Sequence, residues 1–255
     1  MSERKAILVT GSSHGIGAAT VIAFAKDGYD VGINYNKTPE GAQSVAEECR
    51  RYGVDAQIYQ CDVGRRDQCE RMLNAFINHF GRIDVLVNNA GGALKMPKGG
   101  FVDMPMDYWD EQIALNLNSA AYCSQLAARC MIEKGIHGKI INISSINARV
   151  VARPNIVSYV AAKGAVMQMT KALAVEWAQY GICVNAVAPG FFETAMTKVL
   201  FEDPATREEM FRHIPVKRFG NADTDLAGMA VYFASDASNY TTGQIIYIDG
   251  GYTSI

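Results

Sequence analysis

Residues 6–17 read AILVTGSSHGIG, which is an apolar run, a turn rich in glycine and serine, and the start of a helical segment. A phosphate-binding turn requires this strand–turn–helix order, because glycine lets the backbone approach a pyrophosphate and the helix N-terminus attracts its charge. The spacing is Gly-x-x-x-Gly-x-Gly rather than the commoner Gly-x-Gly-x-x-Gly. Taken alone, these residues would serve an ordinary tight turn before a helix equally well.

Beyond this segment, short β-branched runs alternate with longer helical stretches along all 255 residues. Several runs are continuously apolar, which is typical of strands covered on both faces of a parallel sheet. Thr38-Pro39 is expected to begin a helix as N-cap and first helical residue, and Gly53 to close it. Three more glycines lie where helices should end: Gly28, Gly81 and Gly181. The predicted strands are residues 6–10, 30–35, 55–60, 83–87, 139–144, 182–188 and 244–248.

This alternation predicts an α/β fold: a single-domain Rossmann-like doubly wound parallel sheet over residues 1–255. The one long irregular stretch, about residues 190–220, is expected to be a loop that covers the substrate. The sequence shows no linker, repeat or low-complexity tract.

Composition excludes several other classes of protein. The formal net charge of −2 favours neither a nucleic-acid nor a membrane-surface partner. No apolar run is long enough for a membrane span, and the N-terminus lacks the apolar stretch of a signal peptide. The six cysteines form no Cys-x-x-Cys pair and the four histidines lack ligand spacing. We therefore expect free thiols, a cytoplasmic protein and no metal.

Two further segments follow predicted strands where a ligand crevice would lie. Asp62 follows the third strand, where its carboxylate could accept a hydrogen bond from an adenine amino group, or could instead cap the next helix. Asn88-Asn89-Ala90-Gly91 follows the fourth strand, where small and amide residues suit the close approach of a ribose or nicotinamide. The alternative there is an ordinary turn rich in asparagine and glycine.

Tyr159 and Lys163 are spaced to share one face of a predicted helix. A free phenol has a pKa of about 10, and a nearby ammonium favours the phenolate. The pair therefore makes chemical sense as a proton donor and acceptor, although the same spacing alone describes any amphipathic helix. Ser144 and Ser145 end the fifth predicted strand, where a hydroxyl can donate to a substrate oxygen that gains negative charge. For Ser144, capping of the strand end is the preferred interpretation.

The ordered set Thr-Gly-x-x-x-Gly-x-Gly, Asn-Asn-Ala-Gly, Ser145, Tyr159-x-x-x-Lys163 and Pro189-Gly190 resembles the short-chain dehydrogenase/reductase family over nearly the whole chain. The resemblance implies that Ser145, Tyr159 and Lys163 are catalytic, with Lys163 lowering the Tyr159 pKa and bonding the nicotinamide ribose. It also implies that Asn116 holds a water of the proton relay, with Asn118 as the lower-ranked candidate. The resemblance also implies a homotetramer, with faces on the predicted helices 107–134 and 157–180, whose apolar stripes could instead belong to the core of one monomer.

The resemblance extends to the cofactor. Pro189-Gly190-Phe191-Phe192-Glu193-Thr194 resembles the stretch that contacts the nicotinamide, with Thr194 bonding the carboxamide. The complete set of expected cofactor contacts is Gly11, Ser13, His14, Gly15, Ile16, Gly17, Asn36, Lys37, Asp62, Val63, Asn89, Ala90, Gly91, Tyr159, Lys163, Pro189, Gly190, Phe192 and Thr194.

The residues after the second strand bear on the choice of nucleotide. An NAD site usually places an acid about 20 residues past the glycines, to bond the ribose 2′-hydroxyl. Tyr35 stands where the resemblance would put that acid, and His14 and Lys37 could contact a 2′-phosphate. NADP is therefore favoured over NAD, with use of both left open.

The expected function is an NAD(P)-dependent oxidoreductase that interconverts an alcohol and a ketone or aldehyde. The overall pattern is similar to bacterial glucose dehydrogenases and to 3-oxoacyl-acyl-carrier-protein reductases. Ile136 and Tyr180 stand where those reductases carry basic residues that dock the carrier. This difference argues against a carrier-bound substrate and leaves a sugar, polyol, steroid or small ketone. The alternatives of other classes are a non-catalytic NADP-binding sensor and a purely structural oligomer component.

Overall fold

The computed structural model describes residues 4–93, 100–193 and 203–254. Its seven strands form one parallel sheet in the order β3-β2-β1-β4-β5-β6-β7. The predicted doubly wound sheet is confirmed, and each predicted strand overlaps an observed one, with the fourth and sixth strands ending one residue later than predicted. The strands are β1 (Ala6–Val9), β2 (Asp30–Tyr35), β3 (Ala56–Gln60), β4 (Val85–Asn88), β5 (Lys139–Ile143), β6 (Cys183–Pro189) and β7 (Ile245–Ile248).

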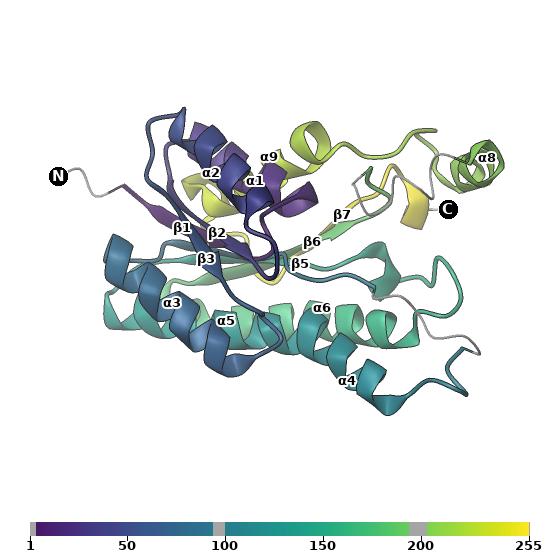
Figure 1. Ribbon diagram of the computed structural model, residues 1–255, viewed down its shortest axis with the longest axis horizontal. Coiled ribbons are helices and arrows are strands. Elements are labelled where there is room, and N and C mark those ends of the chain that lie inside the picture. Colours follow the sequence, from purple (N-terminus) through teal and green to yellow (C-terminus); the bar gives the residue numbers. More distant parts are fainter. Residues whose placement is uncertain (1–3, 94–99, 194–202, 255) are drawn as a thin grey trace.

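Helices cover both faces of this sheet (Figure 1). One layer consists of α1 (Gly15–Lys26), α2 (Glu40–Arg50) and α9 (Ala227–Ala234). The opposite layer consists of α3 (Arg66–Phe80), α4 (Met106–Ile113), α5 (Ser119–Glu133) and α6 (Val157–Trp177). Successive residues of β1 point to opposite faces, so Ile7 and Val9 join one buried apolar cluster and Ala6 and Leu8 the other. The continuous apolar run of this strand thus supplies both cores.

Short helical segments connect or extend the main elements, and α8 lies in the long irregular stretch. These are the π-helical η1 (Ala114–Asn118) and η4 (Ala222–Leu226), the 3-10 turns η2 (Ile146–Ala148), η3 (Ala178–Tyr180), η5 (Asp236–Ser238) and η6 (Tyr252–Ser254), and α8 (Pro204–His213).

The order of the sheet reverses between β1 and β4, which are neighbours in space but not in sequence. In an open parallel sheet, ligands bind outside the carboxyl ends of the strands at such a reversal. The glycine turn follows β1, the Asn-Asn-Ala-Gly segment overlaps the end of β4, and Ser145 follows β5. The topology therefore brings the segments singled out from the sequence to one edge.

The helix ends agree with the sequence in part. Gly81 and Gly181 end their helices in the left-handed conformation, with φ of 75° and 72°. The expected start of α2 was wrong by one residue, because α2 begins at Glu40 and Pro39 is its N-cap, without a capping side chain. The predicted helix 107–134 is divided by the π-helical η1.

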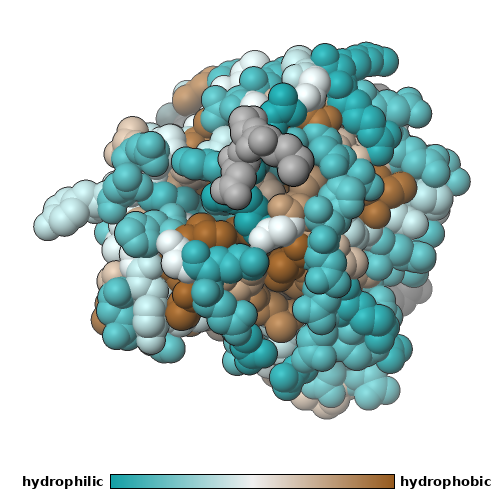
Figure 2. Space-filling view, turned by 90° about the vertical axis from the view of Figure 1, so that its left-hand side faces the viewer, coloured by the Kyte–Doolittle hydropathy of each residue, from teal (hydrophilic) through white to brown (hydrophobic). Residues whose placement is uncertain are grey.

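The opposite end of the molecule, where the N-terminus lies, differs in character (Figure 2). Hydrophilic residues cover most of that face, with a patch of apolar residues near its middle.

All six cysteines are buried free thiols, as the sequence predicted. No helix within the described ranges is long and apolar enough to cross a membrane.

Candidate active site

The glycine turn packs tightly against the end of β4. Gly11 has a φ of +61°, and a Cβ placed on it would lie 2.8 Å from the Cα of Ala90. A Cβ on Gly17 would lie 2.5 Å from the carbonyl oxygen of Gly11 and would also strike the Asn89 amide. Both positions therefore exclude any larger residue. The constraint on Gly17 comes from packing between helix and turn.

Thr10 and Asn89 fix the turn to β4 through their side chains. The Thr10 hydroxyl accepts hydrogen bonds from the backbone N–H groups of Asn89 and Ala90, both at 3.0 Å. The Asn89 amide donates to the carbonyls of Thr10 at 2.9 Å and Gly11 at 3.0 Å. The Asn89 side chain is therefore occupied by the protein itself, and it shapes the crevice floor.

Asn34, at the buried end of β2, fixes the other side of the turn. Its Oδ1 accepts from the Gly11 N–H at 2.9 Å. Its Nδ2 donates to three carbonyls at 3.2 Å each, those of Tyr35, Tyr59 and Cys61. One side chain therefore joins the glycine turn, β2 and the segment after β3. Asn34 was not among the predicted site residues, although a buried polar residue in a strand is a signal for such a role.

The start of α1 suits a diphosphate. The helix begins at Gly15 without a capping side chain and without an acid in its first turn. The first N–H groups of a helix lack partners within it, and the positive end of the helix dipole attracts an anion. Ser13 and His14 precede the helix, with the Ser13 hydroxyl 3.0 Å from Nδ1 of His14. These residues therefore fit the phosphates of a nicotinamide nucleotide.

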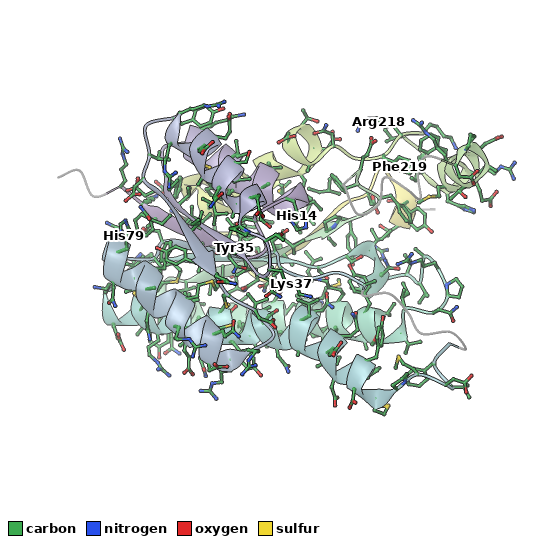
Figure 3. All side chains as sticks on the ribbon, in the orientation of Figure 1. His14, Tyr35, Lys37, His79, Arg218 and Phe219 are labelled. Atoms are coloured by element: carbon green, nitrogen blue, oxygen red, sulfur yellow. The ribbon has the colours of Figure 1, made fainter. Side chains whose placement is uncertain are left out.

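The residues after β2 lie beside this turn. Tyr35 is half-buried, whereas His14, Asn36 and Lys37 are exposed. Figure 3 shows the labelled side chains of His14, Tyr35 and Lys37 in the region where the α1 turn and the end of β2 lie. The segment 34–37 contains no carboxylate that would repel a 2′-phosphate.

The segment after β3 settles one alternative. Asp62 does not cap α3, because that helix begins at Arg66 with Arg65 at the N-cap position. The Asp62 Oδ1 instead accepts from the Gly64 N–H at 3.0 Å, which holds the carboxylate in a tight local turn. Val63 is buried in the apolar cluster against α3, so its main chain is the part that can face a ligand.

Asn116 lies in the π-helical turn η1, and its side chain forms hydrogen bonds with the segment after β4. Its Oδ1 accepts from the Gly92 N–H at 2.8 Å, and its Nδ2 donates to the Gly92 carbonyl at 3.0 Å. The Nδ2 also donates to the Gln112 carbonyl at 3.1 Å. A Cβ on Gly91 would lie 2.7 Å from this Oδ1 and 3.0 Å from Nζ of Lys163. Gly91 therefore lets Asn116 and Lys163 converge under the crevice.

Lys163 is a buried cation on α6. Its Nζ donates to the Ile143 carbonyl at 2.8 Å and lies 5.8 Å from the ring centroid of Tyr159. Burial lowers the Lys163 pKa to about 8. The Ser144 hydroxyl, next along the chain from Ile143, donates to the Lys163 carbonyl at 3.0 Å. This bond supports a structural role for Ser144 rather than a catalytic one.

The Tyr159 phenol responds chiefly to burial, which raises its pKa above the ordinary value. A hydrogen-bond interaction with Ser145 and the positive charge of Arg153 act in the lowering direction. The prediction that Lys163 lowers this pKa is not confirmed, because burial raises the pKa and the groups that favour the phenolate are Ser145 and Arg153.

Ser145 is buried at the end of β5, where its hydroxyl caps the short turn η2. The Oγ accepts from the backbone N–H of Asn147 at 3.1 Å and from the Asn147 Nδ2 at 3.3 Å. The Asn147 Oδ1 accepts from the Ala152 N–H at 3.1 Å. Ser145 is thus held in place by the loop that leads to Tyr159.

The end of β6 forms a further wall. A Cβ on Gly190 would lie 2.8 Å from the Cα of Asp249, so the chain passes β7 closely at this point. Phe192 is buried and packs against Gly220, which leaves its main chain for any cofactor contact. Thr194, the expected carboxamide partner, lies outside the described residues.

Comparisons with known proteins agree on one family. A family model described as enoyl-(acyl carrier protein) reductase matches residues 11–253. The chain is 40% identical over 251 residues to the 3-oxoacyl-[acyl-carrier-protein] reductase FabG of Staphylococcus aureus, covering 98% of this chain and 99% of that protein. The acetoin dehydrogenase YohF of Salmonella typhimurium superposes with a TM-score of 0.86 at 35% identity, covering 98% of each chain.

The chain belongs to the short-chain dehydrogenase/reductase family. A third similar protein is the NADPH-dependent 3-quinuclidinone reductase of Rhodotorula rubra, with a TM-score of 0.90 at 33% identity over 98% of this chain and 92% of that one. As a member of this family the protein is an NAD(P)-dependent oxidoreductase. The predicted family, fold and enzyme class are therefore confirmed, and the substrate becomes the open question.

Proposed function

We propose that this short-chain dehydrogenase/reductase interconverts an alcohol and its ketone or aldehyde, with Tyr159 as general acid and base. The supporting observation is the convergence of Ser145, Tyr159 and Lys163 at the carboxyl edge of the sheet. A sugar, polyol, steroid or small ketone fits the same chemistry.

The substrate oxygen lies between Ser145 and Tyr159 in this mechanism. In reduction Tyr159 gives its proton to that oxygen while Ser145 donates a hydrogen bond to it, and in oxidation Tyr159 takes the proton back. The bound nicotinamide nucleotide supplies or accepts the hydride. Lys163 would hold the ribose of the nicotinamide nucleotide through its Nζ, and Asn116 belongs to the path that returns the proton to solvent.

The test is turnover of a panel of alcohols and ketones with both nucleotides, by the wild type and Tyr159→Phe. We expect the substitution to remove at least 99% of the turnover, roughly a 10²-fold loss, because the phenylalanine has no proton to transfer. Unchanged turnover would refute the mechanism. A folded wild type that binds NADPH but turns over nothing in the panel would favour the non-catalytic sensor.

The residues beside the α1 turn support NADP as the preferred nucleotide. No acid in the segment 34–37 opposes a 2′-phosphate, and Lys37 is exposed beside the turn. The similar reductase of Rhodotorula rubra is named as NADPH-dependent. We expect Lys37→Ala to lower kcat/KM for NADPH while that for NADH stays unchanged, with exposed Lys171→Ala as control. An equal effect on both nucleotides would contradict the assignment.

The carrier-protein alternative makes a distinct prediction. Ile136 packs against the apolar cluster below α5, and Tyr180 is exposed at the end of α6. Neither offers the positive charge that would dock an acidic carrier, whereas one similar structure is named an acetoin dehydrogenase. We therefore expect diacetyl and acetoin to be better substrates than an acyl-carrier thioester. Preferential turnover of the thioester would reverse this proposal.

The proposal also includes a homotetramer located in the cytoplasm. Exposed Val175 on α6, with 81% of its surface accessible, is an apolar residue that an interface would cover.

A further inference from the structure

Asn147 donates two hydrogen bonds to the Ser145 hydroxyl. Its backbone N–H and its Nδ2 both donate to the Ser145 Oγ, at 3.1 Å and 3.3 Å. A serine hydroxyl has two acceptor positions and one hydrogen to donate. Both acceptor positions of Ser145 are therefore filled from one side by one residue.

The orientation of the Asn147 amide follows from its other end. The Oδ1 accepts from the Ala152 N–H at 3.1 Å, and a backbone N–H can only donate. In a flipped amide, Nδ2 would face the Ala152 N–H, which places two donors against each other, and Oδ1 would face the Ser145 hydroxyl. The network therefore fixes Nδ2 as the atom that faces Ser145.

We propose that Asn147 is a positioning residue that makes the Ser145 hydroxyl an obligatory donor toward the substrate oxygen. This proposal rests on the proposed function. With its lone pairs occupied, Ser145 cannot accept the hydrogen of an alcohol substrate, so that hydrogen points to Tyr159. In the reverse direction the same arrangement holds the Ser145 O–H ready for the carbonyl oxygen. Donation into the Ser145 oxygen also strengthens its own O–H as a donor.

A local role accounts for only part of this geometry. The bond from the Asn147 N–H is the normal cap of η2, which any residue at position 147 except proline could make. The bond from Nδ2 needs an amide, and the bond to Ala152 shows that the amide also pins the loop between η2 and α6. An experiment must therefore separate an effect through Ser145 from an effect on the loop.

Asn147→Asp provides the decisive variant. A carboxylate oxygen in place of Nδ2 accepts rather than donates, so the Ser145 O–H turns toward residue 147. With NADPH and diacetyl we expect kcat to fall about 100-fold, as on loss of one oxyanion donor, with little change in the NADPH Kd. In a Ser145→Ala background the same substitution should cost less than about threefold, because the group it acts through is gone. Equal losses in both backgrounds would show a loop effect and overturn the proposal.

Asn147→Ala tests the same point without adding a charge. The cap of η2 remains, but the Nδ2 donor to Ser145 and the Oδ1 acceptor for Ala152 are both lost. We expect about a tenfold fall in kcat that disappears in the Ser145→Ala background, whereas a fall caused by the loop would persist there. Gln125→Glu, an amide-to-carboxylate change at an exposed position of α5, is the matched control. A fall in kcat of less than about twofold in both Asn147 variants would contradict the proposal.

A titration without substrate separates this proposal from the proposed function. The tyrosinate absorbance of Tyr159, taken as wild type minus Tyr159→Phe, reports its pKa directly. In Asn147→Asp the lost interaction with Ser145 should move that pKa upward, and the move should shrink in the Ser145→Ala background. An unchanged titration would overturn the role of Asn147. Failure of the wild type on every substrate would instead refute the proposed function.

Discussion

At the scale of single residues, Lys163 is a buried amine whose charged form is disfavoured in the folded state. It is buried on α6, and its Nζ donates to a backbone carbonyl rather than to a carboxylate. Burial lowers its pKa to about 8, whereas an unfolded lysine titrates at about 10.4. The folded state thus binds fewer protons than the unfolded state between these two values.

We therefore predict that Lys163→Met stabilises the protein at pH 7 while abolishing turnover. The cost of charging Lys163 in the folded state is fully present below pH 8 and fades as the pH rises toward 10.4. The gain at pH 7 should be on the order of 2 kcal/mol after the lost hydrogen bond is subtracted. Urea unfolding at pH 7 and pH 10 measures it, with exposed Lys171→Met as control. A less stable Lys163→Met protein at pH 7 would contradict this.

Arg153 supplies a second prediction. Its positive charge acts to lower the Tyr159 pKa, so Arg153→Ala should raise that pKa. Alcohol oxidation needs the phenolate, so the rising limb of its kcat/KM profile should move to higher pH. Arg149→Ala is the control in the same loop, because the Arg149 guanidinium stacks over the Tyr247 ring at 5.3 Å. Equal shifts in the two variants would argue against a specific role of Arg153.

Spacing alone was enough to single out Tyr159, Lys163 and Ser145. It did not indicate the direction in which the Tyr159 pKa shifts, because the burial that raises this pKa is set by elements distant in sequence. The hydrogen bonds of Asn147 were equally hidden, since the bond to Ala152 depends on the path of the loop.

At the scale of elements, the turn η1 interrupts a helix that the sequence predicts as continuous. The Ser119 N–H donates to the Ala114 carbonyl, as in a π-helix, and passes over the Leu115 carbonyl. The Ser119 hydroxyl donates to that carbonyl at 2.6 Å. The apolar pattern of residues 107–134 did not reveal this turn.

We predict that Ser119→Ala weakens both the fold and the site. The Leu115 carbonyl would lose its partner in a largely buried place, which costs about 1–3 kcal/mol. Turnover should fall as well, because Asn116 lies in the same turn and grips Gly92. Urea unfolding and kcat measure the two effects. Ser235→Ala, which removes a similar bond to a carbonyl at the surface, should cost less; an equal cost would remove the special role of η1.

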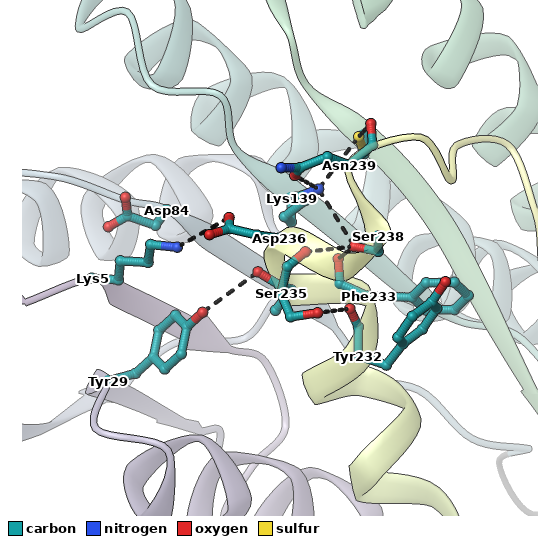
Figure 4. A network of polar contacts seen from close by, with 12 residues as sticks. Lys5, Tyr29, Asp84, Lys139, Tyr232, Phe233, Ser235, Asp236, Ser238 and Asn239 are labelled. Carbon is teal, nitrogen blue, oxygen red and sulfur yellow. Dashed lines mark hydrogen bonds and ion pairs between the residues drawn. The ribbon is translucent and has the colours of Figure 1, made fainter.

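At the scale of the whole molecule, the two ends of the sheet hold buried lysines differently. Lys139, at the N-terminal end of β5, donates to Asn239 at 2.7 Å and to Ser238 at 3.4 Å (Figure 4). These bonds join the sheet to η5 and the residue after it, whereas Lys163 donates to the Ile143 carbonyl at the other end of the same strand. We therefore expect Lys139 to serve the stability of the fold and Lys163 to serve the reaction.

We predict that the protein is a homotetramer in solution. Light scattering should give about four times the chain mass of 27.8 kDa. Val175→Glu, a charge on the exposed face of α6, should lower that mass if this face is in the interface, and exposed Gln43→Glu on α2 shows the effect of an added charge alone. A monomeric wild type would refute the assembly.

The seven strands and the doubly wound class followed from apolar runs that alternate with helical stretches, whereas the order of the strands came from the structure. The hydrogen bonds that support the glycine turn could not be predicted in this way, because they depend on the side chains of Asn34 and Asn89, which reach across strands.

The Asn34 contacts have a consequence for protein engineering. Asn34 anchors the turn through backbone carbonyls and through Gly11, so the exposed side chains of Asn36 and Lys37 and the half-buried ring of Tyr35 take no part in that support. A designer can therefore exchange residues 36 and 37 to redirect a biocatalyst from one coenzyme pool to the other while Asn34 is retained, whereas a replacement for Tyr35 must also pack against the apolar cluster on that side of the sheet.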